Sequence, residues 1–154
     1  MCDYSLMMVP NRLAVEGEEL VAHRFSSGSM GLLSCYDFDS WLNRQPRRFW
    51  QWLMEGFAFP KEPRPVVCIP PGARLRLMSV PEVLKANFPA GSCTDAVFTQ
   101  ISAETSHYRD ALCFANGTAV LLQLLPEGQR LRVLRMSSSE DFEPERNWSE
   151  PVLA

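Results

Sequence analysis

The sequence is poor in the residues and segments that would point directly to a chemical activity. It contains only two histidines, His23 and His107, and its five cysteines include no Cys-x-x-Cys pair. Neither a zinc knuckle nor a dithiol redox site is indicated, and the dispersed thiols are expected to be reduced. Any mechanism based on an imidazole has only two residues to draw on.

Long apolar runs are also missing. No stretch is long enough to cross a membrane, and residues 1–10 lack the basic start and apolar centre of a signal peptide. We therefore expect a cytoplasmic protein with no membrane association. The formal net charge of −3 gives no general attraction to nucleic acid, so the overall charge indicates no nucleic-acid partner.

What the chain does contain is a strong pattern of β-strands. Asn116-Gly117 lies between two apolar runs, Asp110–Ala115 and Thr118–Leu125, and this dipeptide favours a tight hairpin turn. The segment Arg130–Met136 then alternates arginine with apolar residues, which is typical of a strand with one wet face. We predict that these three segments form a meander of neighbouring strands around which the rest of the chain packs.

Further strands and two helices are predicted before the meander. Glu18–Phe25 and Gly31–Cys35 form a candidate hairpin around the break at Ser26–Ser29. Three more segments have the pattern of strands: Val66–Ile69, Ala73–Leu77 and Asp95–Ile101. A short helical turn is predicted near Asp39, followed by two candidate helices at Arg47–Met54 and Val80–Asn87. The predicted fold class is α+β and mainly β, a curved antiparallel sheet or small open barrel of about seven strands with two short covering helices.

The composition divides the chain into two parts. Residues 1–136 have the apolar content of a single globular domain, whereas residues 137–154 are acidic and poor in branched aliphatic residues. Such a segment buries too little apolar surface to offset the entropy of ordering it, so we predict a mobile tail. Its functional alternative is an acidic arm that binds a basic partner or folds over the site.

The first candidate site is the polar run from His107 to Asp110. If this run is extended, His107 and Arg109 share one face and Tyr108 and Asp110 share the other. Such a cluster would orient a base or bind an anion, and its structural alternative is an ordinary strand entry. The leading functional hypothesis is a small binding or regulatory domain with a polar pocket here, for a small molecule or protein whose identity the sequence does not give.

Cys2 is the second candidate. Removal of Met1 would leave an N-terminal cysteine whose α-amine accepts a proton while the thiolate attacks a carbonyl. The Met-Cys start resembles that of class II glutamine amidotransferases and of SOS-response-associated peptidases, but both follow the cysteine with glycine where this chain has Asp3-Tyr4. The alternative function is thus an enzyme that uses Cys2 as its nucleophile, an amide hydrolase or amidotransferase-like enzyme, with His107 as a second candidate catalytic residue. No cofactor is indicated, and the metal hypothesis is a single iron, copper or zinc ion held partly by Cys2.

A broader resemblance links the two candidate sites. The opening Met-Cys-Asp-Tyr-Ser-Leu, the run Asp-Ala-Leu ending in Phe-Ala-Asn-Gly117, and Glu127-Gly-Gln-Arg130 resemble a group of short, uncharacterised bacterial proteins. That group has no known activity, so the resemblance implies no catalytic residue. It does suggest that the N-terminus and the meander are parts of the same structural unit. We therefore expect Cys2, Asp3 and Tyr4 to lie near His107–Asp110 and to form one polar site with them.

Overall fold

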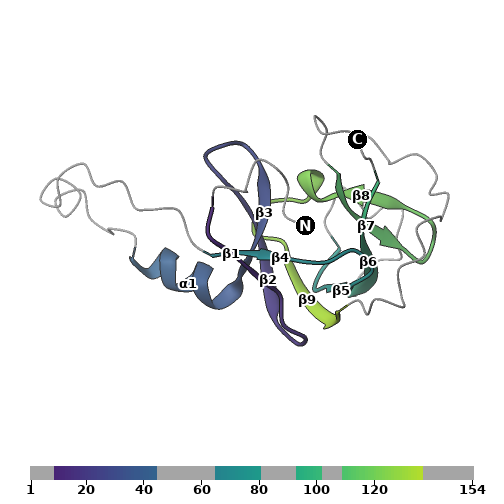
Figure 1. Ribbon diagram of the computed structural model, residues 1–154, viewed down its shortest axis with the longest axis horizontal. Coiled ribbons are helices and arrows are strands. Elements are labelled where there is room, and N and C mark those ends of the chain that lie inside the picture. The colour runs from purple at the N-terminus through teal and green to yellow at the C-terminus, as the bar shows by residue number, and fades with distance from the viewer. Residues whose placement is uncertain (1–8, 45–64, 81–92, 102–108, 137–154) are drawn as a thin grey trace, which may run out of the picture.

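The computed structural model describes residues 9–44, 65–80, 93–101 and 109–136 (Figure 1). Within these ranges the chain forms one mixed sheet of nine strands and one α-helix. The elements in chain order are β1 (Asn11–Leu13), β2 (Glu19–Arg24), β3 (Met30–Ser34), α1 (Cys35–Arg44), β4 (Val66–Cys68), β5 (Arg74–Leu77), β6 (Thr94–Gln100), β7 (Asp110–Phe114), β8 (Ala119–Leu121), the 3-10 turn η3 (Leu122–Leu124) and β9 (Arg130–Arg135).

The predicted mainly-β fold is confirmed in its broad form, with two corrections. The sheet has nine strands rather than about seven, and it is mixed rather than wholly antiparallel, because β1, which no local pattern predicted, pairs in parallel with β4. All other pairs are antiparallel. The sheet is open, with β1 and β8 at its edges. No helix in the described ranges is long and apolar enough to span a membrane.

The strand order is β1-β4-β3-β2-β9-β5-β6-β7-β8. The first four strands lie on one side of β9 and the next four lie on the other, so the last strand in sequence joins two blocks. This arrangement corrects the predicted meander: β7 and β8 are neighbours, but β9 pairs with β2 and β5 instead of β8. In Figure 1 the yellow-green β9 runs between the purple β2 and the teal β5.

The β7–β8 hairpin has the turn that the Asn-Gly pair predicts. Gly117 has a φ of 83°, a backbone conformation that glycine adopts without steric cost. The Asn116 side chain accepts a hydrogen bond from the Thr118 amide at 3.0 Å. After Leu121 the chain leaves the sheet in the turn η3, because Leu122 and Leu125, three residues apart, both turn into the core.

The main core fills the inner face of the sheet. Alternate residues of the strands point inward, and the fully buried row Leu20, Leu131 and Leu77 crosses β2, β9 and β5 at matched positions. A side chain then brings the two sides of the curled sheet together. The Gln123 carboxamide accepts a hydrogen bond from the Met30 amide at 2.8 Å and donates one to the Gly28 carbonyl at 2.9 Å.

A smaller apolar cluster lies on the outer face, under α1. It joins Val21, Phe25, Leu33, Cys35 and Val66, and Phe38 of the helix packs against it. The structure extends the predicted short helical turn near Asp39 into ten residues that begin at Cys35. The predicted helices at 47–54 and 80–87 fall wholly or mostly outside the described residues, as does the acidic tail at 137–154.

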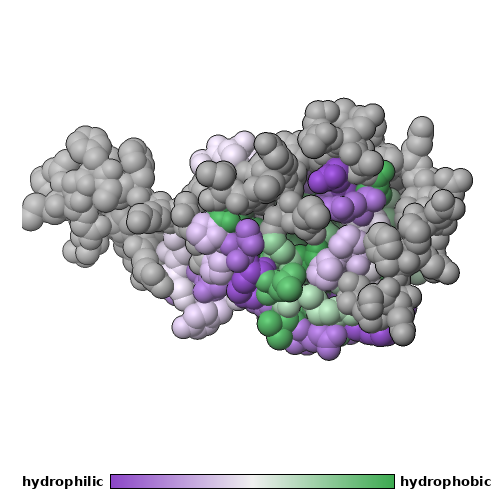
Figure 2. Space-filling model, in the orientation of Figure 1, coloured by the Kyte–Doolittle hydropathy of each residue, from purple (hydrophilic) through white to green (hydrophobic). Residues whose placement is uncertain are grey.

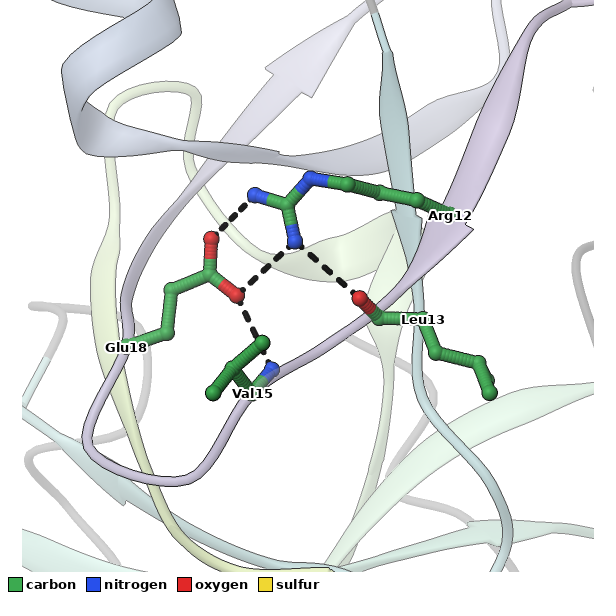
Figure 3. Close-up of polar contacts among 4 residues, drawn as sticks. All are labelled: Arg12, Leu13, Val15 and Glu18. Carbon is green, nitrogen blue, oxygen red and sulfur yellow. Dashed lines mark hydrogen bonds and ion pairs between the residues drawn. The ribbon is translucent and has the colours of Figure 1, made fainter.

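An ion pair organises the connection from β1 to β2 (Figure 3). The Arg12 guanidinium donates to both oxygens of Glu18 and to the Leu13 carbonyl, and the Val15 amide donates to Glu18 Oε2 at 3.0 Å. The hydrogen bond from Arg12 is the main reason that the pKa of Glu18 lies below its ordinary value. The same contact raises the pKa of Arg12. These contacts fix the connection between β1, the edge strand, and β2.

Candidate binding surface

The outer face of β5 and β9 carries a group of exposed or partly exposed arginines, which we call the arginine face. Alternation along each strand sends Leu75, Leu77, Leu131 and Val133 inward and the arginines outward. The five members are Arg74 and Arg76 from β5 and Arg130, Arg132 and Arg135 from β9.

The register places these arginines directly opposite one another. Arg76 pairs across the strands with Arg132, and Arg74 pairs with Arg135. Like charges in directly opposite positions of an antiparallel pair are unfavourable. A β-bulge lies between the two pairs, where the register shifts between Arg74 and Leu75. Bulges are frequent beside functional sites because they redirect side chains.

Two carboxylates flank the central pair. Across four strands one row reads Glu19, Arg132, Arg76 and Asp95. Asp95 accepts two hydrogen bonds from Arg76, at 2.6 Å to Nε and 3.0 Å to Nη2, and this contact lowers the pKa of Asp95. Arg132 Nη2 donates one hydrogen bond to Glu19 Oε1. Each guanidinium is held by a carboxylate on the side away from the other arginine, and the space between Arg76 and Arg132 faces solvent.

Arg130 and Arg74 are less compensated than the central pair. Arg130 lies 3.6 Å from Asp39 of α1, and both side chains are about half exposed. Arg74 makes no ion pair with any described residue, and its neighbour on β6 is the apolar Val97. The face thus gathers five guanidinium groups on a protein whose net charge is negative, and the ion pairs of Arg76, Arg130 and Arg132 are with Asp95, Asp39 and Glu19.

Figure 2 shows how hydropathy is distributed on the face of the molecule that it presents. Hydrophobic residues of the described part reach this face mainly below the centre of the view, and hydrophilic residues lie on either side of them. The large hydrophobic residues that are exposed include Leu13 at the end of β1, Val15 in the β1–β2 connection, and Tyr36 on α1, which has an exposed fraction of 79%.

His23 forms a second unusual environment beside the arginine face. Its ring lies 5.1 to 5.6 Å from the rings of Phe25, Phe38 and Trp41. Its Nδ1 is 2.9 Å from Glu127 Oε1, but the contact lacks hydrogen-bond alignment, and this buried nitrogen has no hydrogen-bond partner in the described part. His23 therefore lies on the outer face of the sheet, under α1.

The predicted polar site is described only at its C-terminal end. The Ile101 amide donates to the Arg109 carbonyl at 3.0 Å, and Gln100 Nε2 donates to Asp110 Oδ1 at 3.1 Å. These bonds anchor the start of β7 to β6. The other predicted members lie outside the described residues, so their association with Asp110 stays a prediction: Cys2, Asp3, Tyr4, His107 and Tyr108.

The cysteines correct one expectation. Cys68 is disulfide-bonded, contrary to the prediction of reduced thiols, and Cys35, Cys93 and Cys113 are free. Burial raises the pKa of the Cys113 thiol to about 11 and also raises that of Cys35, so neither is activated as a nucleophile. The described residues contain no group of three or more His, Cys, Asp or Glu side chains that could hold a metal ion.

Comparison with known proteins adds no relative to this picture. No family model, no curated protein and no solved structure matches the chain.

Proposed function

We propose that this protein is a small binding or regulatory domain that binds an anionic ligand on the arginine face. The observation that carries the proposal is the pair of directly opposed arginine couples on β5 and β9. A sheet selected for stability alone would place opposite charges at these positions. Departures from such local rules are expected at functional sites.

An anion would fit between β5 and β9, where the two arginines of each couple face each other. Guanidinium groups bind phosphate and carboxylate oxygens through two parallel hydrogen bonds. Asp95 and Glu19 hold Arg76 and Arg132 from the outer side, so less side-chain entropy is lost when a ligand binds. Strand positions are also more rigid than loop positions, which favours precise placement of the charges.

The competing location is the start of β7, where the sequence predicts a polar pocket. Arg109 and Asp110 belong to that pocket, and the cytoplasmic location expected from the sequence belongs to the same hypothesis. Because β6 separates β5 from β7 in the sheet, the two locations are tested by different substitutions.

The first prediction concerns tripolyphosphate, a simple multivalent anion, titrated into the full chain by calorimetry. Arg74→Gln with Arg76→Gln should weaken binding at least tenfold, because each opposed couple then keeps one guanidinium. Arg109→Gln is the matched control and should bind as the wild type does. Equal binding by the double variant would exclude the arginine face, and loss of binding in Arg109→Gln would move the site to the start of β7.

A further inference from the structure

The arginines lie along a track, and a single small anion cannot contact all of them. Side chains two residues apart on one face of a strand are separated by about 6.6–6.8 Å. Along β9 the positions Arg130 and Arg132 are followed by Arg135 beyond the bulge, with Arg76 and Arg74 beside the last two. The track therefore offers three successive levels of positive charge, which suits a ligand whose anionic groups repeat along a chain.

The composition of the track favours a ligand with both charged and planar groups. All five members are arginine, although a lysine would supply the same charge. The guanidinium plane binds phosphate through a fork of donors and also stacks on aromatic rings, which the lysine ammonium does not. Stacking on bases and contact with backbone phosphates are combined in proteins that bind single-stranded nucleic acid.

An exposed aromatic side chain lies near one end of the track. Asp39 of α1 contacts Arg130, and Tyr36 is three residues before Asp39, so the two side chains lie on the same side of the helix. Tyr36 has an exposed fraction of 79% and packs into neither apolar cluster. A ring in this position is available to a base of a strand that follows the arginines.

The curvature of the sheet distinguishes one strand from two. Gln123 ties the turn after β8 to the β2–β3 hairpin, so the sheet curls around its inner core and the arginine face is the convex side. Duplex DNA is stiff over about 150 base pairs and would touch a convex surface only at a tangent. A flexible single strand follows such a surface.

We infer that the arginine face binds the phosphate backbone of single-stranded nucleic acid, with Tyr36 stacking on a base. This inference rests on the proposed function and specifies the class of its ligand. The negative net charge of the chain limits general attraction to polyanions, so recognition depends on the local placement of the five arginines.

The test uses a fluorescein-labelled oligothymidylate of twelve nucleotides, measured by anisotropy with the full chain. We expect binding that is at least tenfold tighter than to a duplex of the same length. The logarithm of the affinity should fall with the logarithm of salt concentration with a slope of about −2 to −3.5, as for three to five neutralised phosphates. Arg74→Gln with Arg76→Gln should weaken binding at least tenfold.

Tyr36 provides the sharper variant because its side chain is exposed and its removal leaves the core intact. Tyr36→Ala should weaken oligothymidylate binding about fivefold or more, by loss of base stacking, and leave tripolyphosphate binding unchanged. Tyr36→Phe keeps the ring and should bind as the wild type does. Arg74→Lys with Arg76→Lys keeps the charge and should weaken oligothymidylate binding more than tripolyphosphate binding.

The outcomes separate this inference from the proposed function. Tripolyphosphate binding without oligothymidylate binding would overturn the nucleic-acid assignment and leave the anion site. Equal affinity for inorganic polyphosphate of matched charge, with Tyr36→Ala without effect, would do the same. Binding to phosphatidylserine vesicles in place of the oligonucleotide would assign the face to a lipid surface. Absence of binding to every probe would overturn both proposals.

Discussion

Glu18 shows how one side chain fixes a connection that has no regular structure of its own. Its carboxylate accepts hydrogen bonds from the Arg12 guanidinium and the Val15 amide, and Ser34 also donates to it. Only 14% of the Glu18 side chain is exposed, so the charge depends on these donors in place of water. The sequence did not single out Glu18, since its partners become visible only once β1 and β3 are in place.

The second prediction follows from the lowered pKa of Glu18. A carboxyl group with a lowered folded-state pKa stabilises the fold above its unfolded pKa, and the contribution is lost as the pH falls through the folded value. Glu18→Gln should lower the free energy of unfolding by about 1 kcal/mol at pH 7, because a charge-assisted pair is replaced by a neutral acceptor. The difference should shrink below the ordinary pKa of 4.5, as measured by urea unfolding at several pH values.

A suitable control is Glu127→Gln, since Glu127 is more than half exposed and lies outside the Arg12–Glu18 contact. A difference between wild type and Glu18→Gln that is constant from pH 7 to pH 3 would contradict the proposed role of the ionised carboxylate.

At the level of elements, η3 matters because it carries Gln123 to the β2–β3 hairpin. The Met30 amide is a partly buried donor that is satisfied by the Gln123 carboxamide, and Arg24 adds a bond from its guanidinium to the Gln123 carbonyl at 3.3 Å. These bonds hold together two segments that no strand pairing connects.

The third prediction is that Gln123→Ala destabilises the protein by about 1–3 kcal/mol, the cost of leaving a buried donor unsatisfied. The measurement is thermal or urea unfolding, with amide exchange at Met30 as a local readout. Gln100→Ala is the matched control: it removes a glutamine hydrogen bond to Asp110, but between strands that are already paired, and should cost less. If both variants lose the same stability, Gln123 has no special role.

The elements also show what a sequence pattern can and cannot predict. Alternation identified the strands at 18–25, 73–77 and 130–136, and Asn116-Gly117 identified the β7–β8 hairpin, because these signals are local. Alternation also showed that Arg130 and Arg132 face solvent. That they lie opposite the arginines of β5 depends on a strand pairing between distant segments, for which no local signal exists.

Two elements were predicted wrongly for physical reasons that the structure makes clear. The short helical turn near Asp39 is a helix of ten residues, because Phe38 and Trp41 both contact the His23 ring on β2, which favours its continuation. The strand predicted over residues 118–125 ends at Leu121, because the next leucines bury themselves better in a 3-10 turn. In both cases tertiary packing overrides the local pattern.

At the level of the whole molecule, β9 joins the two blocks of the sheet through its buried residues. Leu131 is fully buried, and its neighbours across the ladders are Leu20 on β2 and Leu77 on β5. The fourth prediction is that Leu131→Ala lowers the free energy of unfolding by about 2–5 kcal/mol, through lost burial and the cavity left behind.

The readout for this variant is amide exchange in both blocks. Protection in β3 and in β6 should fall together, because each block loses the same central packing. Leu134→Ala, at a partly exposed position on the same strand, is the control and should cost less. Loss of protection in one block only would show that the blocks are stable independently of β9.

The place of β9 in the sheet has a consequence for how the chain is made. The ribosome synthesises the other eight described strands before β9, at roughly 5–20 residues per second, so these strands lack their central neighbour until β9 emerges. Until then β2 and β5 each present an unsatisfied hydrogen-bonding edge that other nascent chains can join. Translation must reach β9, near the end of the globular part, before those edges are paired. Premature termination would therefore leave an aggregation-prone fragment and not a shorter folded protein.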